Sequence, residues 1–299
     1  MNSRALSFLL ICVSVLLIAC KPSVRKGHDI FAANQALFDA MIRTIYRENP
    51  NFIAPDARAT ELNVFDFDHT LANTETMIPI RDASDKVTAR RDSKCFFVRK
   101  GESADFSVFT RDRLMAGNPI AFVMERARVA GRAANELVFI VTARGQSHTF
   151  QSAHEYLRKR GVRVNGVIAV NSPLVRDNLW KKLRLPAGMN KLPGGMKKPL
   201  LIAALIEHAR ERNAKIKTVR YYEDTDKYIG GYIQFMSRTY PKITAEVRDY
   251  IRSGKPNQRT YREKLVARVQ DGKARDEHGK TVSNPSAYDS GDCPPPPQP

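Results

Sequence analysis

The sequence has little of what channels, disulfide-rich proteins and zinc proteins require. Its only long apolar run lies at the N-terminus, which excludes a protein with many membrane spans. Its four cysteines are too few for a disulfide-built miniprotein and form no CxxC pair. Its six histidines are scattered without metal-ligand spacing, so no structural zinc site is expected.

Acidic residues are also scarce relative to basic ones. The chain has 49 Lys and Arg against 31 Asp and Glu, a formal net charge of +18. This excess of positive charge favours anionic partners such as nucleic acid, phosphorylated compounds or anionic lipid. A solvated surface that happens to be rich in lysine and arginine would explain the same excess equally well. With 42% hydrophobic and 27% charged residues over 299 positions, the composition is that of a folded protein with a sizeable core.

The first twenty residues have the pattern of a bacterial targeting signal. Arg4 precedes an apolar stretch over 6–19 that is too short for a comfortable membrane span and suits a signal peptide. The stretch ends in LIAC at Cys20, which resembles the lipobox of bacterial lipoproteins, where the cysteine receives a diacylglycerol. We therefore expect a signal peptide over 1–19, a lipid on Cys20 and a bacterial cell-envelope location facing the periplasm or the cell exterior. An ordinary secretory signal, or a short uncleaved anchor, is the alternative.

Two further inferences depend on that signal. Lys21, rather than Asp, follows the cysteine, and this resembles the outer-membrane sorting of Gram-negative lipoproteins. After processing, Cys95 and Cys293 would be the only unmodified thiols, and they could pair in an oxidising compartment.

The rest of the chain alternates apolar strands with amphipathic helices. A short polar tether is expected over 20–28, followed by one domain over 29–255. The expected strands are 62–65, 137–141, 167–170 and 218–222, and the expected helices include 29–48, 147–160 and 198–212. This alternation predicts an α/β fold with a parallel sheet.

Two segments do not fit the alternation. Residues 72–114 are mixed in character and are expected to form a small cap-like insertion. Residues 256–299 turn polar, with a basic helix expected around 260–269 and a disordered or extended proline-rich end.

Two carboxylates, Asp66 and Asp68, directly follow the strand expected over 62–65. Strand alternation would point both the same way, where their charges repel each other. A divalent cation relieves this repulsion, and carboxylate oxygens beside phosphate oxygens suit Mg²⁺.

The segment that contains this pair resembles the first motif, DxDxT, of the haloacid dehalogenase-like phosphatase superfamily, with Asp66, Asp68 and Thr70 in its fixed positions. The other three motifs occur in the required order. They are Thr142 after a strand, Lys197 or Lys198 at the start of a later helix, and the acidic pair Glu223-Asp224 after another strand. The resemblance covers roughly 60–240 and implies a Rossmann-like parallel sheet sandwiched by helices.

The resemblance also implies roles for these residues. Asp66 would be the nucleophile, and Asp68 the general acid and base, which requires a raised pKa. Mg²⁺ would lie between Asp66, the backbone carbonyl of Asp68 and Asp224, with Glu223 as the close alternative ligand.

The remaining motif residues would hold the phosphate. Thr142 would donate a hydrogen bond to a phosphate oxygen, and Lys198, with Lys197 as the alternative, would offset negative charge. Arg144 could contact substrate or be solvated, and Trp180 could stack on a base, although a packed loop tryptophan is the favoured interpretation.

The expected function is therefore Mg²⁺-dependent hydrolysis of nucleotides or general phosphomonoesters. Resemblance to polynucleotide-kinase phosphatase domains leaves nucleic-acid ends as an alternative substrate. A basic envelope lipoprotein without activity is the alternative from another class. Nothing in the sequence indicates a protein partner.

Overall fold

The computed structural model describes residues 22–74, 77–92, 98–105, 107, 117–145, 149–193, 195–253, 259–285 and 288–289. Cys20, Cys95 and Cys293 lie outside these residues, so the lipid-anchor and disulfide predictions stay predictions. None of the described helices combines the length and the hydropathy that a membrane span requires.

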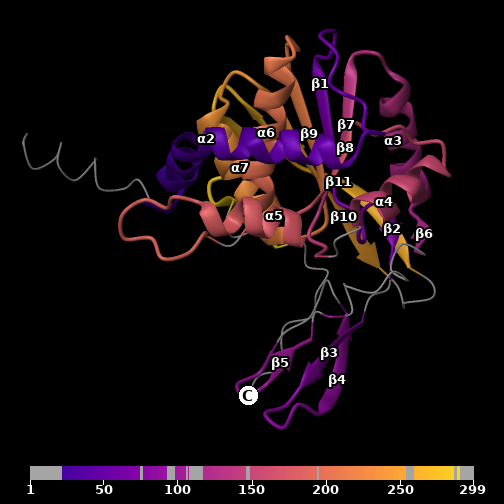
Figure 1. Ribbon diagram of the computed structural model, residues 1–299, viewed down its shortest axis with the longest axis vertical. Helices are drawn as coiled ribbons and strands as arrows, with labels where there is room; N and C mark the ends of the chain where they lie inside the picture. Colours follow the sequence, from indigo (N-terminus) through magenta and orange to yellow (C-terminus); the bar gives the residue numbers. More distant parts are fainter. Residues whose placement is uncertain are drawn as a thin grey trace, which may run out of the picture.

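A seven-stranded, mostly parallel sheet forms the centre of the fold (Figure 1). Its strands are β1 (Glu61–Phe65), β7 (Glu136–Thr142), β8 (Gly166–Ala169), β9 (Thr218–Glu223), β10 (Thr244–Ser253), β11 (Thr260–Gln270) and β12 (Lys273–Arg275). The spatial order is β12-β11-β10-β9-β1-β7-β8, and the five strands from β10 to β8 are parallel. Strands β1 and β7 are almost entirely buried, as their continuous apolar sequences require when both faces of a sheet are covered.

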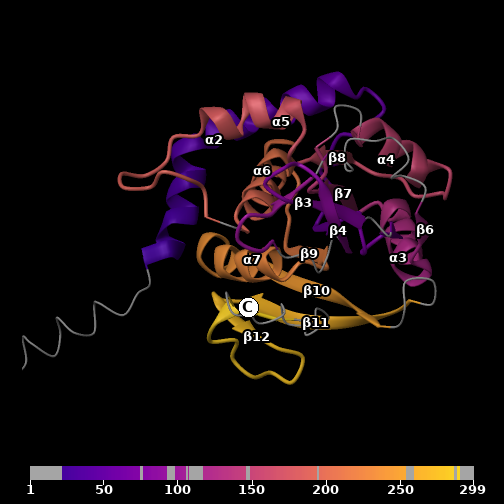
Figure 2. The ribbon, with the colours of Figure 1, turned by 90° about the horizontal axis from the view of Figure 1, so that it is seen from below.

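Helices flank the sheet on both faces (Figure 2). They are α2 (Pro22–Glu48), α3 (Ala121–Arg132), α4 (Thr149–Arg158), the short α5 (Pro173–Asn178) with the 3₁₀ turn η3 (Trp180–Lys182), α6 (Lys197–Glu211) and α7 (Asp226–Thr239). Helices α6 and α7 cover one face, α3 and α4 lie on the other, and α2 packs across the outside of α6 and α7. The predicted α/β fold with a parallel sheet is confirmed.

Helix α2 is longer than the sequence indicated. It begins at Pro22, so most of the expected tether over 20–28 is helical. The buried side chain of Asn34 joins this helix to the body, because its Nδ2 donates to the carbonyl of Arg184 at 2.9 Å and its Oδ1 accepts from the amide of Arg184 at 2.8 Å. The helix is therefore part of the folded unit.

Described parts of the segment predicted to be an insertion form a separate small sheet. Strands β3 (Met77–Arg81), β4 (Val87–Asp92) and β5 (Ser103–Ala104) pair with one another and lie apart from the central sheet (Figure 1). The antiparallel pair β2 (Ala72–Asn73) and β6 (Asn118–Pro119) flanks the insertion where the chain leaves and rejoins the main body.

The expected basic helix over 260–269 is wrong. These residues form β11, which pairs antiparallel with β10 and continues the central sheet beyond the expected boundary at residue 255. Its charged side chains find cross-strand partners, such as Arg268 with Glu246 at 2.8 Å, while Val266, Ala267 and Val269 are buried. Because its charges are paired across strands, this polar sequence forms a strand, although its polarity had suggested a basic helix.

Candidate active site

The strand order brings the separate motifs to one edge of the sheet. Strand β1 lies between β7 and β9, with Phe65 level with Ile140 on one side and with Tyr222 on the other. Asp66 follows β1, and Thr142 and Glu223 are the last residues of the neighbouring strands. The carboxyl ends of parallel strands are where α/β proteins bind ligands.

A tight turn fixes the two aspartates after β1. The amide of Asp66 donates to the carbonyl of Tyr222 at 2.8 Å, and the carbonyl of Phe67 accepts from the amides of Leu71 and Ala72, both at 3.0 Å. His69 takes the left-handed backbone conformation that the turn requires, with φ of 58°. The chain therefore reverses direction immediately after Asp66 and Asp68.

Lys198 is the cation at the centre of the site. Its side chain is 1% exposed, and its Nζ lies 2.8 Å from Oδ1 of Asp66 and 2.6 Å from Oε2 of Glu223. Lys197, the alternative, is only half-buried and donates instead to Oδ1 of Asn171 at 2.9 Å. The structure therefore brings Lys198, and not Lys197, to the aspartate expected to act as nucleophile.

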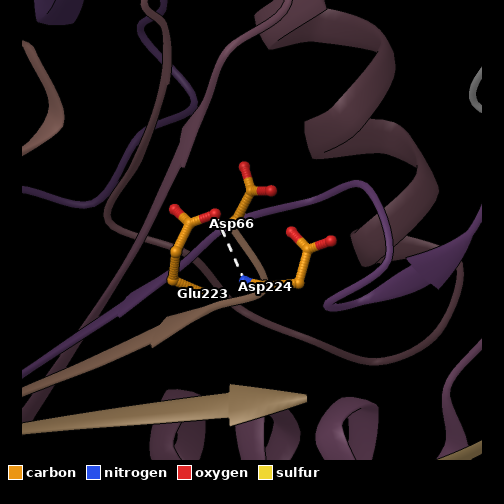
Figure 3. A group of neighbouring side chains, drawn as sticks. All are labelled: Asp66, Glu223 and Asp224. Carbon is orange, nitrogen blue, oxygen red and sulfur yellow. Dashed lines mark hydrogen bonds between the residues drawn. The ribbon is translucent and has the colours of Figure 1, made fainter. Parts of the chain in front are cut away.

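Three carboxylates gather around this lysine. Asp66, Glu223 and Asp224 are all buried, and each offers an oxygen that lies within 4.8 Å of the others (Figure 3). A set of hard, anionic oxygen donors at this spacing fits a small divalent cation such as Mg²⁺.

Contacts around Glu223 distinguish the two candidate ligands of the fourth motif. Its carboxylate accepts from Lys198, from the hydroxyl of Tyr221, and from the amides of Asp224 at 3.2 Å and Thr225 at 3.0 Å. Figure 3 shows the Glu223 carboxylate turned back toward the amide of Asp224. The Glu223 carboxylate is thus already hydrogen-bonded to Lys198 and to the start of the following loop, and Asp224 is therefore the better candidate metal ligand.

The acidic cluster strongly affects Asp66. Burial raises the pKa of Asp66, the charges of Glu223 and Asp68 raise it further, and Lys198 lowers it, with a net value of about 7. An ionised Asp66 therefore needs more positive charge than Lys198 alone supplies, and a divalent cation would provide it.

Asp68 is in a different electrostatic environment from the one expected. Arg144 donates to both of its oxygens, from Nε at 2.9 Å and from Nη2 at 2.6 Å, and the hydroxyl of Thr74 donates at 2.6 Å. Burial favours the protonated form, but Arg144 and Thr74 outweigh it and hold the pKa of Asp68 below its ordinary value. The expectation of a raised pKa is wrong for this state of the protein, because the sequence could not show the pairing with Arg144.

Arg144 is the functional candidate that sequence reasoning undervalued. Its side chain is fully buried, so the interpretation as a solvated arginine is wrong. The available signal was its position two residues after Thr142, which places it at the same edge of the sheet as Asp68 but does not show that the two side chains pair. Trp180 is a packed side chain, as favoured: its Nε1 donates to the carbonyl of Val170 at 2.6 Å, and its ring packs edge-on against Phe38.

Comparison of the chain with protein-family models, with curated proteins and with solved structures found no match in any of the three. The geometry and chemistry of the site are therefore what indicate the function of this protein.

Proposed function

We propose that this protein is a Mg²⁺-dependent phosphomonoester hydrolase of the haloacid dehalogenase-like superfamily, acting on nucleotides or other phosphomonoesters through an aspartyl-phosphate. The observation that carries the proposal is the position of Lys198, which bridges Asp66 and Glu223 at the carboxyl edge of the sheet beside Asp224. A buried cluster of three carboxylates around one lysine is costly for stability alone. This cost also argues against an envelope protein that has only kept the fold.

The first half of the reaction transfers the phosphoryl group to the protein. A carboxylate oxygen of Asp66 attacks phosphorus, the bond from phosphorus to the ester oxygen breaks, and the leaving oxygen takes a proton from Asp68. Bound Mg²⁺, held by Asp66, Asp224 and the carbonyl of Asp68, would neutralise charge on the phosphoryl oxygens. Thr142 and Lys198 supply a hydrogen-bond donor and a fixed positive charge at the same edge.

Arg144 explains how Asp68 could obtain its proton. In the structure its guanidinium is bidentate to Asp68. An incoming phosphoryl group is a stronger anionic partner and competes with Asp68 for this arginine. Loss of that pairing would raise the pKa of Asp68 when substrate binds, because burial then dominates. The acid would therefore be formed by substrate binding.

The second half returns the protein to its starting state. Asp68, now a carboxylate, takes a proton from water, and the water oxygen attacks phosphorus. The bond between phosphorus and Asp66 breaks, which gives inorganic phosphate and a free Asp66 carboxylate. When phosphate leaves and Arg144 pairs with Asp68 again, Asp68 gives its proton to the solvent, the source from which it took one on substrate binding. The predicted lipid on Cys20 would hold this activity at the bacterial envelope.

The direct test is hydrolysis of 4-nitrophenyl phosphate by the full chain purified in detergent. We expect turnover with Mg²⁺, none in excess chelator, recovery when Mg²⁺ is restored, and none in Asp66→Asn at any Mg²⁺ concentration. Absence of turnover toward this ester and toward nucleotides would overturn the proposal and favour the non-enzymatic alternative.

A further inference from the structure

Two lysines at the edge that carries the acidic cluster have no role in the chemistry above. Lys197 is the first residue of α6, and Lys227 is the second residue of α7, so both stand in the first turn of a helix that starts beside the site. Among the described residues, neither has an acidic side chain within ion-pair distance, whereas Lys181 and Lys198 each have one. Their charge is therefore available to a ligand.

Each lysine is connected to the site through one intermediate group. Nζ of Lys227 lies 5.1 Å from the ring centre of Tyr228, and Nζ of Lys198, which touches Asp66, lies 4.6 Å from the same ring centre. Lys197 donates to the side chain of Asn171, whose Nδ2 donates at 2.6 Å to the carbonyl of Ala143, the residue after Thr142. Each ammonium group is thus separated by one intermediate group from a residue at the edge of the sheet that carries Asp66 and Thr142.

The two lysines also affect each other. Partial burial lowers the pKa of Lys197, and the positive charge of Lys227 lowers it further. The loop before α6 brings them together, because Gly195 has φ of 82° and a side chain there would collide with the carbonyl of Lys227, with its Cβ only 2.1 Å away. The loop before α6 therefore packs directly against the backbone of Lys227, and an anion bound by both side chains would relieve the repulsion between their charges.

We propose that Lys197 and Lys227 form a second anion-binding subsite that selects phosphomonoesters carrying an additional phosphate group. The inference rests on the proposed function, since the first phosphate must occupy the site at Asp66. A nucleoside bisphosphate has the required chemistry, and so does a phosphorylated end of an oligonucleotide, whose next phosphodiester supplies the second charge. A simple monoester would leave the two lysines without an anionic partner.

The test compares specificity rather than activity. Initial phosphate release by the full chain with Mg²⁺ is measured for adenosine 3′-monophosphate, adenosine 5′-monophosphate, adenosine 3′,5′-bisphosphate and a 5′-phosphorylated dinucleotide. We expect kcat/KM for at least one substrate with two phosphates to exceed that of the better monophosphate by about tenfold. The double variant Lys197→Gln/Lys227→Gln should reduce this ratio to within about twofold of one, and added salt should reduce it in the wild type. Preference for the bisphosphate alone would identify a small-molecule source, and equal preference for the dinucleotide a nucleic-acid end.

The matched control is Lys273→Gln, which removes one exposed lysine from β12 at the far edge of the sheet and should keep the preference. Equal kcat/KM for monophosphates and bisphosphate in the wild type, or a preference that survives the double variant, would overturn the subsite and leave the proposed function intact. Absence of hydrolysis of every substrate would overturn both.

Discussion

Replacing Lys198 by methionine keeps a side chain of similar length but removes the cation that, among the described residues, is the only buried one in contact with both Asp66 and Glu223. In the wild type, Nζ lies 2.8 Å from one carboxylate and 2.6 Å from the other. Removing one partner of a buried ion pair costs about 3–5 kcal/mol, because the remaining charges stay buried without compensation. We expect a loss of that size in the free energy of unfolding at pH 8, measured by urea denaturation with Mg²⁺ removed by chelator.

The loss should depend on pH with a definite sign. The pKa of Asp66 is already raised to about 7 in the folded wild type, and it rises further without Lys198. A carboxyl group whose folded pKa exceeds its unfolded pKa contributes stability at low pH and loses it as pH rises through the folded value. At pH 5.5 the variant can therefore protonate Asp66, which removes one of the two buried charges left without Lys198, and its deficit should be smaller than at pH 8 by about 1–2 kcal/mol.

The neighbouring residue provides the control. Lys197→Met removes the same charge one position earlier, from a half-buried side chain that touches no carboxylate, and should cost less than about 1 kcal/mol at either pH. Equal losses for the two variants, or a deficit in Lys198→Met that does not shrink between pH 8 and pH 5.5, would refute the electrostatic reasoning.

Three further predictions concern the metal and Arg144. Mg²⁺ at about 100 times its Kd should stabilise the protein by about 2.7 kcal/mol, which scanning calorimetry would record as a rise in Tm of roughly 5–10 °C. The variant Asp224→Asn should abolish this rise. A rise that survives in Asp224→Asn but not in Glu223→Gln would mean that the ligand is Glu223. Because Asp66 must lose its proton to bind the ion, titration calorimetry should show Mg²⁺ affinity falling below about pH 7 with proton release, and an affinity that is constant from pH 5 to pH 8 would contradict this. Arg144→Gln should lower kcat/KM for 4-nitrophenyl phosphate by about 10²-fold and raise the pKa of Asp68 in the free protein, visible as a shift of the pH–rate profile to higher pH; an unchanged profile would exclude the proposed coupling.

The elements that could be predicted from the sequence are those whose signal is local. The apolar runs at 62–65, 137–141, 167–170 and 218–222 correspond to β1, β7, β8 and β9, because strands buried on both faces need continuous apolar sequence. Strand β11 was missed for the opposite reason. Its charged residues are stabilised by partners on β10, and such long-range pairing leaves no local periodicity to detect.

The site shows the same division between local and tertiary information. Resemblance to four ordered motifs, each at a strand end or a helix start, selected Asp66, Asp68, Thr142 and the acidic pair at the end of β9 as candidates. The choice between adjacent residues was not accessible from sequence, because it depends on which face of the first turn of α6 points at Asp66. The pairing of Arg144 with Asp68 joins residues 76 positions apart, and it reverses the direction of the pKa shift expected for Asp68.

The central claim is that Asp66 carries the phosphoryl group during turnover, and rapid quenching followed by mass spectrometry tests it most directly. The full chain is mixed with Mg²⁺ and excess substrate, quenched in acid within the first turnover and digested. We predict one phosphoryl group on the peptide that contains Asp66, removed by hydroxylamine as an acyl phosphate must be, and none in Asp66→Asn. Turnover without phosphate on that peptide, or undiminished turnover in Asp66→Asn, would contradict the account.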